Sequence, residues 1–462
     1  MTKTELAVIG AGPAGLAAAS AAARLGVQVT LVDEYPTPGG QYLKGAHWPV
    51  SLPPALVTER QARALLSQLA QDPVDLRTQT LVWGLEGRCL ALRSPGGTEW
   101  LEAEAIVVAT GARELVLPFP GWTLPGVMTL GAAQLLAKGQ AILPGRRVLL
   151  AGSGPLLLPV ACGLSQHGAQ VVAVLEASRP ARWLGHAPAV WGNWDRLREG
   201  AYYVRQLRKN RIAYRLGWTA VQAIGQHELE GVVLGRLDRQ GRPLPGSQEQ
   251  VDVDALCLGF GFVPNVELTQ LAGCLHQFDP ARGGWVPSVD ERLETSVPGV
   301  FVAGEAAGIG GAAAAMLEGR IAGLAAAHRL GRLRGEELSR ELRSLAPRRR
   351  HLQRFAGMLN TLFVPPPGLD LLTADDTPIC RCEEVSVGEV RAAVARGALE
   401  LDALKTWTRV GQGPCQGRTC GPLLARLVAH ETGQRVARSG LFRARPPLKP
   451  VPLGELAMEM RK

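Results

Sequence analysis

Residues 6–15 read Leu-Ala-Val-Ile-Gly-Ala-Gly-Pro-Ala-Gly, an apolar strand that runs directly into three glycines. A helix of small residues follows, and then a second apolar strand that ends at Val32. In such a unit Gly10 permits the tight turn, Gly12 lets a pyrophosphate approach the backbone, and Gly15 lets the helix pack closely on the strand. The stretch therefore predicts a Rossmann-like lobe that binds a dinucleotide.

Four neighbouring residues complete this candidate site. Asp33 lies 23 residues after Gly10, where a carboxylate can accept hydrogen bonds from a pair of ribose hydroxyls. It is preferred over Glu34 because it follows the apolar strand directly. Pro13 and Ala14 stand at the N-terminus of the predicted helix, where the helix dipole favours the charge of a pyrophosphate. A unit of this kind without a ligand is the alternative interpretation.

A second unit of the same type begins with the apolar residues 147–151. Gly152 and Gly154 form its turn, and its second strand ends in Glu176, 24 residues after Gly152. Leu157 takes the place of the third glycine, so this helix and strand cannot approach as closely. The sequence predicts a second Rossmann-like lobe.

The ligand of the second lobe stays open at this point. A carboxylate at Glu176 repels a 2′-phosphate, which favours NAD over NADP, but Arg179 and Arg182 lie just beyond and would offset it. The alternatives are NAD(H), another adenine nucleotide, or a vestigial lobe that binds nothing.

Four cysteines near the C-terminus form a Cys-x-Cys pair, Cys380 and Cys382, and a Cys-x4-Cys pair, Cys415 and Cys420. Two close thiolate pairs can hold one [2Fe–2S] cluster, because each iron takes two sulfur ligands. Zinc also takes four thiolates, but Cys-x-Cys is tighter than the usual zinc spacings, and unligated thiols are a third alternative. Glycines surround the second pair, and glycine lets backbone N–H groups approach cluster sulfurs. The pattern favours the iron–sulfur cluster.

Composition narrows the class of protein further. A chain of 462 residues is expected to form about three domains, and its 46% apolar content suffices for large cores. We expect a cytoplasmic protein, because neither a secretory signal nor a transmembrane segment is recognisable and the thiols would stay reduced there. Nucleic acid is not an expected partner, because the net charge of +9 is dispersed and aromatic residues are only 5%. Dinucleotide phosphates and an acidic partner surface explain the charge better.

Three further segments resemble the two-dinucleotide-domain flavoproteins, in particular their thioredoxin-reductase branch. Pro38-Gly-Gly-Gln41 matches the segment that runs beside the flavin in that family, and Ile106-Val-Val-Ala-Thr-Gly111 matches the exit from the FAD lobe. Pro298-Gly-Val-Phe-Val-Ala-Gly304-Glu305 matches the segment whose acidic residue, usually Asp, binds near the ribityl chain and pyrophosphate. The resemblance implies that FAD is bound by residues of these segments and of the next helix: Gly40, Gln41, Thr110, Gly111, Gly304, Glu305, Gly311 and Ala312.

The resemblance also implies a division of the chain. Residues 1–120 and 275–330 are expected to form a discontinuous FAD-binding lobe, with an NAD(P)-binding-like lobe, 121–274, inserted between them. A helical linker, 331–375, would lead to a small, mainly helical [2Fe–2S] domain with a Pro-rich tail, 376–462. The expected fold is therefore α/β, with two Rossmann-like lobes of the glutathione/thioredoxin-reductase type and a C-terminal iron–sulfur domain. Residues 445–452 are too rich in proline for a helix and should lie extended across a surface.

Both lobes together with Cys380-Arg-Cys382-Glu and Cys415-Gln-Gly-Arg-Thr-Cys420-Gly are similar to a narrower group. This group comprises the α-type subunits of opine oxidases, of hydroxyproline and proline dehydrogenases, and of hydrogen cyanide synthase, and Leu258-Gly-Phe-Gly-Phe-Val-Pro-Asn265 belongs to the resemblance. The cysteine domain resembles bacterioferritin-associated ferredoxin, in which the second pair is Cys-x2-Cys.

The resemblance implies an electron-transfer subunit with FAD and a [2Fe–2S] cluster in a heteromeric amino-acid or opine dehydrogenase or oxidase. The amine would be oxidised on a D-amino-acid-oxidase-like flavoprotein β subunit, a small ferredoxin-like subunit is a further expected partner, and the electron acceptor would provide any membrane association. No cysteine pair lies beside either flavin motif, which excludes disulfide reduction, and no acid–base pair or nucleophile emerges. The alternatives are a stand-alone NAD(P)H-dependent flavin reductase that reduces its own cluster, and a regulatory subunit with a bound nucleotide.

Overall fold

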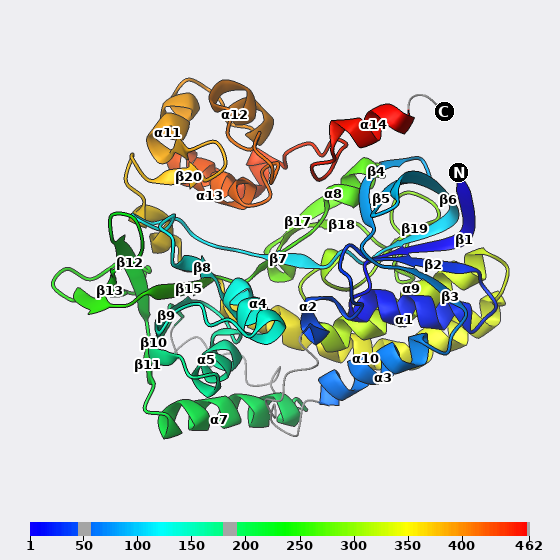
Figure 1. Cartoon of the computed structure of the whole chain (residues 1–462), viewed down its shortest axis with the longest axis horizontal. Coiled ribbons are helices and arrows are strands. Elements are labelled where there is room, and N and C mark those ends of the chain that lie inside the picture. Colours follow the sequence, from blue (N-terminus) through cyan, green and yellow to red (C-terminus); the bar gives the residue numbers. More distant parts are fainter. Residues whose placement is uncertain (45–56, 179–191, 460–462) are drawn as a thin grey trace.

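The computed structural model describes residues 1–44, 57–178 and 192–459. These residues form two mainly parallel β-sheets flanked by helices, and a small helical unit near the C-terminus packs against them (Figure 1). The α/β fold class expected from the sequence is confirmed. Within the described ranges, no helix combines the length and the apolar character needed to cross a membrane.

The first sheet joins the N-terminal strands to a strand almost 200 residues later, because β19 pairs with β6 in parallel. Its order is β3-β2-β1-β6-β5-β4, with β4, β5 and β6 antiparallel. The strands are β1 (Thr2–Ile9), β2 (Val29–Val32), β3 (Val74–Arg77), β4 (Leu81–Glu86), β5 (Cys89–Ser94), β6 (Gly97–Val108) and β19 (Val300–Val302).

Helices α1 (Pro13–Ala23) and α9 (Ala312–Arg329) pack against each other beside this sheet, and α3 (Val57–Leu69) lies against α1. Two glycines of α9 allow the close crossing. A Cβ added at Gly319 would lie 2.0 Å from the carbonyl oxygen of Ala14, and one at Gly323 would lie 2.3 Å from that of Ala18. The first glycine turn and α9 are thereby held together.

The second sheet is entirely parallel, in the order β11-β10-β9-β15-β8. A three-stranded antiparallel sheet, β12-β13-β14, shares an apolar core with it. The strands are β8 (Val127–Thr129), β9 (Arg147–Gly152), β10 (Gln170–Glu176), β11 (Ala213–Leu216), β12 (Trp218–Ile224), β13 (Gly231–Arg236), β14 (Glu249–Asp252) and β15 (Ala255–Gly259), and the helices are α4 (Leu130–Gln140), α5 (Leu157–Gln166) and α7 (Trp194–Lys209).

Two short strands carry the chain between the sheets, and they pair with each other in antiparallel fashion. β7 (Ala112–Glu114) leaves the first sheet after β6, and β16 (Phe262–Pro264) returns from the second after β15. After the return come α8 (Glu267–Leu271), β17 (His276–Asp279), the 3₁₀ helix η2 (Pro280–Arg282), β18 (Gly284–Pro287) and the 3₁₀ helix η3 (Gly304–Ala306).

Helix α10 (Gly335–Leu362) connects the two halves of the molecule. It packs against α9 and ends beside the second sheet, where the Ser153 hydroxyl donates a hydrogen bond of 2.9 Å to the Phe363 carbonyl. The 3₁₀ helix η4 (Pro367–Leu372) then leads to the C-terminal unit. That unit contains β20 (Pro378–Cys380), β21 (Val385–Ser386), α11 (Val387–Ala395), α12 (Leu401–Thr408), α13 (Cys420–Thr432) and the 3₁₀ helix η5 (Val436–Ser439).

The C-terminal unit is firmly joined to the rest of the protein. A single apolar cluster includes Ile379, Val390 and Leu424 of this unit together with Trp122 and Leu258 from the side of the second sheet. Burial of this shared apolar surface stabilises the junction, so the unit is not a loosely tethered module.

The Pro-rich residues 445–452 are not helical, as expected, and they lie on the chain's own first sheet. The Leu448 N–H donates 2.7 Å to the Trp83 carbonyl on β4, and the Leu448 side chain is buried. The short helix α14 (Leu453–Glu459) follows, and Glu455 pairs with Arg93 of β5 at 2.7 Å. The tail thus extends from the C-terminal unit to the sheet that contains the N-terminus (Figure 1).

Candidate functional site

The first glycine turn has the geometry that a bound pyrophosphate needs. Gly10 has a φ of +101°, and a Cβ added there would lie 2.4 Å from the Ala109 carbonyl oxygen. A Cβ at Gly15 would lie 1.7 Å from the Gly10 carbonyl oxygen, so the helix can only approach with glycine there. At Gly12 the nearest atom to an added Cβ is 4.0 Å away, on Gly40. The face of Gly12 is therefore open, while the two outer glycines are required by the fold.

The other flavin-type segments converge on this turn. The Gly39 N–H donates 2.7 Å to the Ala11 carbonyl, which seats the Gly40–Gln41 segment, the start of α2 (Gly40–Leu43), beside Gly12. A Cβ added at Gly304 would lie 2.7 Å from the Ala14 side chain. Pro13 and Ala14 are the first two residues of α1, and Gly311 and Ala312 form the N-terminus of α9. Segments far apart in the sequence thus surround the N-terminus of α1, the place expected for a pyrophosphate.

Asp33 and Glu34 differ sharply in their surroundings. The buried Asp33 carboxylate accepts the N–H of Ala11 at 2.6 Å and that of Tyr35 at 2.8 Å, while its burial raises its pKa. Each of its oxygens keeps a lone pair for a further donor. Glu34 is exposed and forms an ion pair with Lys449 of the tail. A pocket of about 460 Å³ opens here, lined among others by Glu34, Tyr35, Gln79, Leu81, Arg93 and Lys449.

Glu305 and the exit of β6 complete the first site. The Gly311 N–H donates to the Glu305 carboxyl, and burial raises the pKa of that carboxyl. Gly111 has a φ of +69°, and a Cβ added there would meet nothing within 4 Å. Thr110 hydrogen-bonds to Asn265 rather than facing open space, with its hydroxyl donating 3.2 Å to the Asn265 carbonyl. These residues fit a bound FAD, since a turn with an open face, a buried carboxyl and a helix N-terminus lie together.

The second glycine turn repeats part of this arrangement. The buried Glu176 carboxylate accepts the N–H of Gly154 at 3.0 Å and that of Ser178 at 2.8 Å, and burial raises its pKa. A Cβ added at Gly152 would lie 1.8 Å from the Gly259 carbonyl oxygen, so the tight turn is preserved. Arg179 and Arg182 lie outside the described residues.

Two features set the second turn apart from the first. Helix α5 begins at Leu157, five residues after Gly152, whereas α1 begins at Pro13, three residues after Gly10. In addition, the C-terminal end of α10 places the Phe363 carbonyl on this turn. A helix C-terminus carries partial negative charge, which disfavours a phosphate at this position.

The four C-terminal cysteines come together as two pairs that cross the sequence motifs. Cys380 hydrogen-bonds to Cys420, and Cys382 hydrogen-bonds to Cys415. Cys380 and Cys420 are buried, whereas Cys382 is exposed and Cys415 half-buried. In the described ranges, no three or more Cys, His, Asp or Glu side chains lie close enough to hold one metal ion. Two separate thiol pairs fit two irons better than a single tetrahedral zinc.

The surroundings of the thiols suit a cluster that is screened from water. Backbone N–H groups of Gly411 and Glu383 point at the Cys380 sulfur, and the hydrogen bond from Cys420 lowers the pKa of Cys380 to about 5. The same hydrogen bond raises the pKa of Cys420. A pocket of about 310 Å³ lies beside the thiols, lined by apolar side chains such as Trp122 and Leu258. The thiols therefore face the junction with the second sheet.

The glycines around the second cysteine pair have a second function besides approaching sulfur. Cβ atoms added at Gly411, Gly417 and Gly421 would lie 2.8, 2.3 and 3.3 Å from the ring of Phe442. A Cβ at Gly413 would lie 2.2 Å from the Cys382 Cβ. The cysteine loop is thus folded around the Phe442 ring, which the sequence did not reveal.

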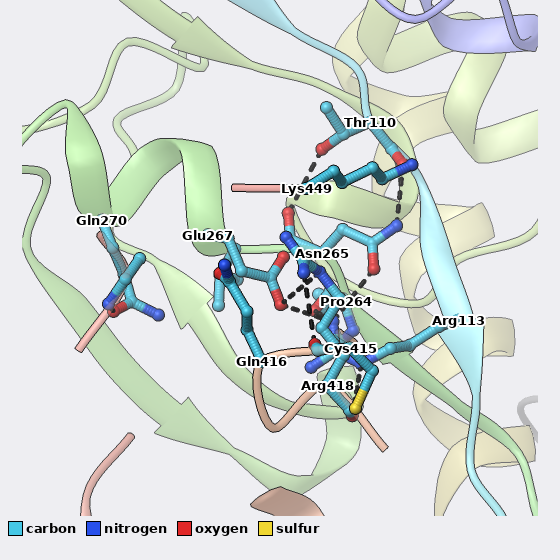
Figure 2. A network of polar contacts seen from close by, with 12 residues as sticks. Thr110, Arg113, Pro264, Asn265, Glu267, Gln270, Cys415, Gln416, Arg418 and Lys449 are labelled. Atoms are coloured by element: carbon cyan, nitrogen blue, oxygen red, sulfur yellow. Dashed lines mark hydrogen bonds and ion pairs between the residues drawn. The ribbon is translucent and has the colours of Figure 1, made fainter. Parts of the chain in front are cut away.

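Sequence reasoning also missed a polar network between the crossing strands and the cysteine loop (Figure 2). Arg113 of β7 donates to Asn265, to Glu267 and to the carbonyl of Arg418, which lies between Cys415 and Cys420. The available signals were the position of Arg418 inside the cysteine motif and that of Asn265 at the end of residues 258–265.

The comparisons with known proteins agree with this geometry. A family model described as pyridine nucleotide-disulphide oxidoreductase matches residues 4–331. The chain belongs to the pyridine nucleotide-disulphide oxidoreductase family. This family assignment covers both sheets, and a separate model, the sarcosine oxidase A3 domain, matches residues 377–459. The expected resemblance is confirmed in both parts of the chain.

Individual relatives of this oxidoreductase are components of multi-subunit enzymes. The chain is 33% identical to the A-type component of opine oxidase from Agrobacterium tumefaciens, over 98% of this chain and 91% of the relative. It is 34% identical to the HcnB component of hydrogen cyanide synthase from Pseudomonas aeruginosa, over 96% of each. Among solved structures, L-proline dehydrogenase from P. horikoshii matches 98% of this chain and 79% of its own with a TM-score of 0.71 at 22% identity, which shows a shared fold.

Proposed function

We propose that this chain is the FAD- and [2Fe–2S]-containing electron-transfer subunit of a heteromeric dehydrogenase or oxidase that acts on the CH–NH group of an amino acid or opine. The observation that carries this proposal is the contact between the paired cysteines and the first dinucleotide site. The cysteine loop bonds directly to Arg113, two residues after Gly111. Similarity to the opine oxidase component over nearly the whole chain supports the substrate class.

The residues available to hold the groups follow from the geometry. Gly12 and the start of α1 would take the pyrophosphate of FAD, Asp33 the adenosine ribose, and Glu305 the ribityl chain. Cys380 with Cys420, and Cys382 with Cys415, would each hold one iron. Bound together, the flavin and the cluster supply exchange between two-electron and one-electron carriers.

The same proposal divides the chain into functional parts. The FAD-binding lobe comprises 1–120 and 275–330, and the pairing of β19 with β6 supports this division. The NAD(P)-binding-like lobe comprises 121–274, the helical linker 331–375, and the iron–sulfur domain with its tail 376–462. We propose that the second lobe is a scaffold rather than a nicotinamide site, because the Phe363 carbonyl lies on its glycine turn.

The partner in this proposal is a D-amino-acid-oxidase-like flavoprotein β subunit, on which the amine is oxidised. A small ferredoxin-like subunit would be a further member of the complex. The names of the relatives, which are subunits of oxidases and of a synthase, support a multi-subunit assembly.

Co-expression with and without the partner tests the proposal. The isolated chain should carry FAD and about two irons, as one [2Fe–2S] cluster requires, yet oxidise neither amino acids nor opines. The complex should reduce an artificial dye with one of these substrates. Fast bleaching of the flavin of the isolated chain by NADH, lost in Glu176→Ala, would instead identify a stand-alone reductase. An isolated chain without flavin and iron would contradict the proposal.

A further inference from the structure

The crossing strands meet the first dinucleotide site at a point that is unusually rich in hydrogen bonds. The Thr110 hydroxyl donates to the Asn265 carbonyl at 3.2 Å, and the Asn265 side-chain N–H donates back to the Thr110 carbonyl at 2.9 Å. The Asn265 N–H also donates to the Gly111 carbonyl at 3.0 Å. The end of β6 and the residue after β16 are thereby held in a fixed relation.

The guanidinium of Arg113 extends this arrangement to the cysteine loop. Its Nη1 donates to the Asn265 side-chain oxygen at 3.0 Å and to Glu267 Oε1 at 2.9 Å, and its Nε donates to the Arg418 carbonyl at 2.9 Å. The side chains of Arg113 and Glu267 are only 22% and 18% exposed, so water competes little for these bonds. A planar guanidinium can reach acceptors in several directions at once, which an ammonium cannot.

The loop side of the network is equally well defined. Arg418 Nη1 donates to the Cys415 carbonyl at 3.2 Å, and Arg418 Nε lies 3.6 Å from Glu267 Oε1. Glu267 therefore stands between two guanidiniums and offsets their repulsion. An unbroken series of bonds leads from Thr110 through Asn265 and Arg113 to the cysteine loop (Figure 2).

We propose that Arg113 is the positioning residue that holds the cysteine loop, residues 415–420, at a fixed distance from the flavin side of the molecule at Thr110–Gly111. This inference rests on the proposed function. Because the rate of electron transfer through protein falls exponentially with distance, Arg113 thereby sets the rate at which one electron leaves the reduced flavin and reduces the oxidised cluster. Arg113 itself carries no electron and donates no proton in this step.

Substitutions at two arginines separate this proposal from a general effect on stability. Arg113→Gln removes the guanidinium, and Arg113→Lys keeps the charge without the planar set of donors. Arg426→Gln is the matched control. Arg426 of α13 forms an ion pair of similar exposure with Asp370, at 2.8 and 3.0 Å, on a different side of the C-terminal unit.

The measurement uses the full-length holoprotein. After photochemical reduction of the flavin, the absorbance of the cluster reports its reduction, while flavin and iron contents are determined in parallel. In Arg113→Gln we expect both contents to be unchanged and cluster reduction to slow about tenfold or more, as small misplacements do in other reactions. Arg113→Lys should lie between Arg113→Gln and the wild type, and Arg426→Gln should match the wild type. Unchanged cluster reduction in Arg113→Gln would overturn the proposal.

Hydrogen–deuterium exchange gives a second readout that needs neither cofactor. In Arg113→Gln and in Glu267→Gln, the amides of residues 411–421 should exchange faster, whereas those of α11 should be unaffected. Wild-type protein that lacks flavin or iron would contradict the proposed function and would leave this exchange test intact. Unaltered exchange of the loop in both variants would overturn the positioning by Arg113.

Discussion

At the scale of single residues, the two buried carboxylates Asp33 and Glu176 show how one device is used twice. Each accepts the N–H of its own glycine turn and the N–H two residues further along the chain. The sequence predicted both positions from their distance to the first glycine. The structure adds that each carboxylate also holds its turn in shape, so replacing either one would alter the turn as well as a ribose contact.

Gly12→Val tests the first dinucleotide site. The φ of Gly12 is −75°, and its open face leaves room for a side chain, so the unliganded fold should tolerate valine. The branched side chain would occupy the space that a pyrophosphate needs. We expect bound FAD to fall about tenfold or more with little change in melting temperature, corresponding to about 1.4 kcal/mol or more of binding free energy.

Gly139→Val on the exposed surface of α4 is the control for this substitution, because a Cβ there meets nothing within 4 Å. It should keep its FAD. Normal flavin content in Gly12→Val would show that the first turn is structural only.

Cys382→Ser tests the cluster at its exposed corner. Cys382 is exposed, so a hydroxyl there should leave the apolar core intact, whereas the iron bound by Cys382 and Cys415 would lose a thiolate. We expect iron, determined by elemental analysis, to fall from about two per chain while FAD is retained. Cys89→Ser, on the distant strand β5, should leave iron unchanged, and stoichiometric zinc in the wild type would contradict the assignment.

At the scale of elements, the cysteine loop depends on an aromatic ring supplied from a later part of the chain. Gly411, Gly417 and Gly421 all face Phe442, and none could carry a side chain without moving the ring. The loop and the segment after η5 therefore form one packed element. Its glycines read from the sequence as a feature of cluster binding alone, because a contact with residue 442 leaves no local pattern.

Phe442→Ala should loosen this element. Loss of the half-buried ring removes apolar contact worth about 2 kcal/mol, and three glycines would then face a void. We expect iron to be removed by a chelator several-fold faster than from the wild type, with FAD content unchanged. Phe442→Leu, which keeps most of the apolar volume, should lie close to the wild type, and equal chelation rates in all three proteins would refute the packing argument.

At the scale of the whole molecule, the C-terminal unit is held at three places. It shares an apolar cluster with the second sheet, it bonds through Arg418 to the crossing strands, and its tail lies on the first sheet. The Pro-rich tail was expected to lie across a surface, and that surface is the chain's own first sheet. Lys449 places the tail at the rim of the pocket next to Glu34.

Removal of residues 444–462 should therefore weaken FAD binding. The deletion uncovers the β4–β5 edge where Leu448 is buried and removes Lys449 from the pocket. We expect FAD to dissociate several-fold faster in a dilution assay, while the cluster keeps its visible spectrum. Deletion of residues 453–462 alone should have little effect, because Leu453 is 82% exposed and the Arg93–Glu455 pair is near the surface. Equal FAD dissociation in both truncated proteins would show that the tail has no part in the first site.

The sequence by itself determined both glycine turns, the two carboxylates that end their strands, the identity of the four paired cysteines and the fold class. These features could be predicted because a tight turn, a φ above zero and a thiolate ligand are properties of one residue and its close neighbours. Only the tertiary structure decided that Cys380 pairs with Cys420, that Phe442 fills the glycine loop, that Phe363 covers the second turn and that Arg113 meets Arg418. Each of these contacts joins residues far apart in the sequence, with a separation of 305 positions for Arg113 and Arg418. Such contacts arise from the packing of sheets and helices into one body, and no local pattern records them.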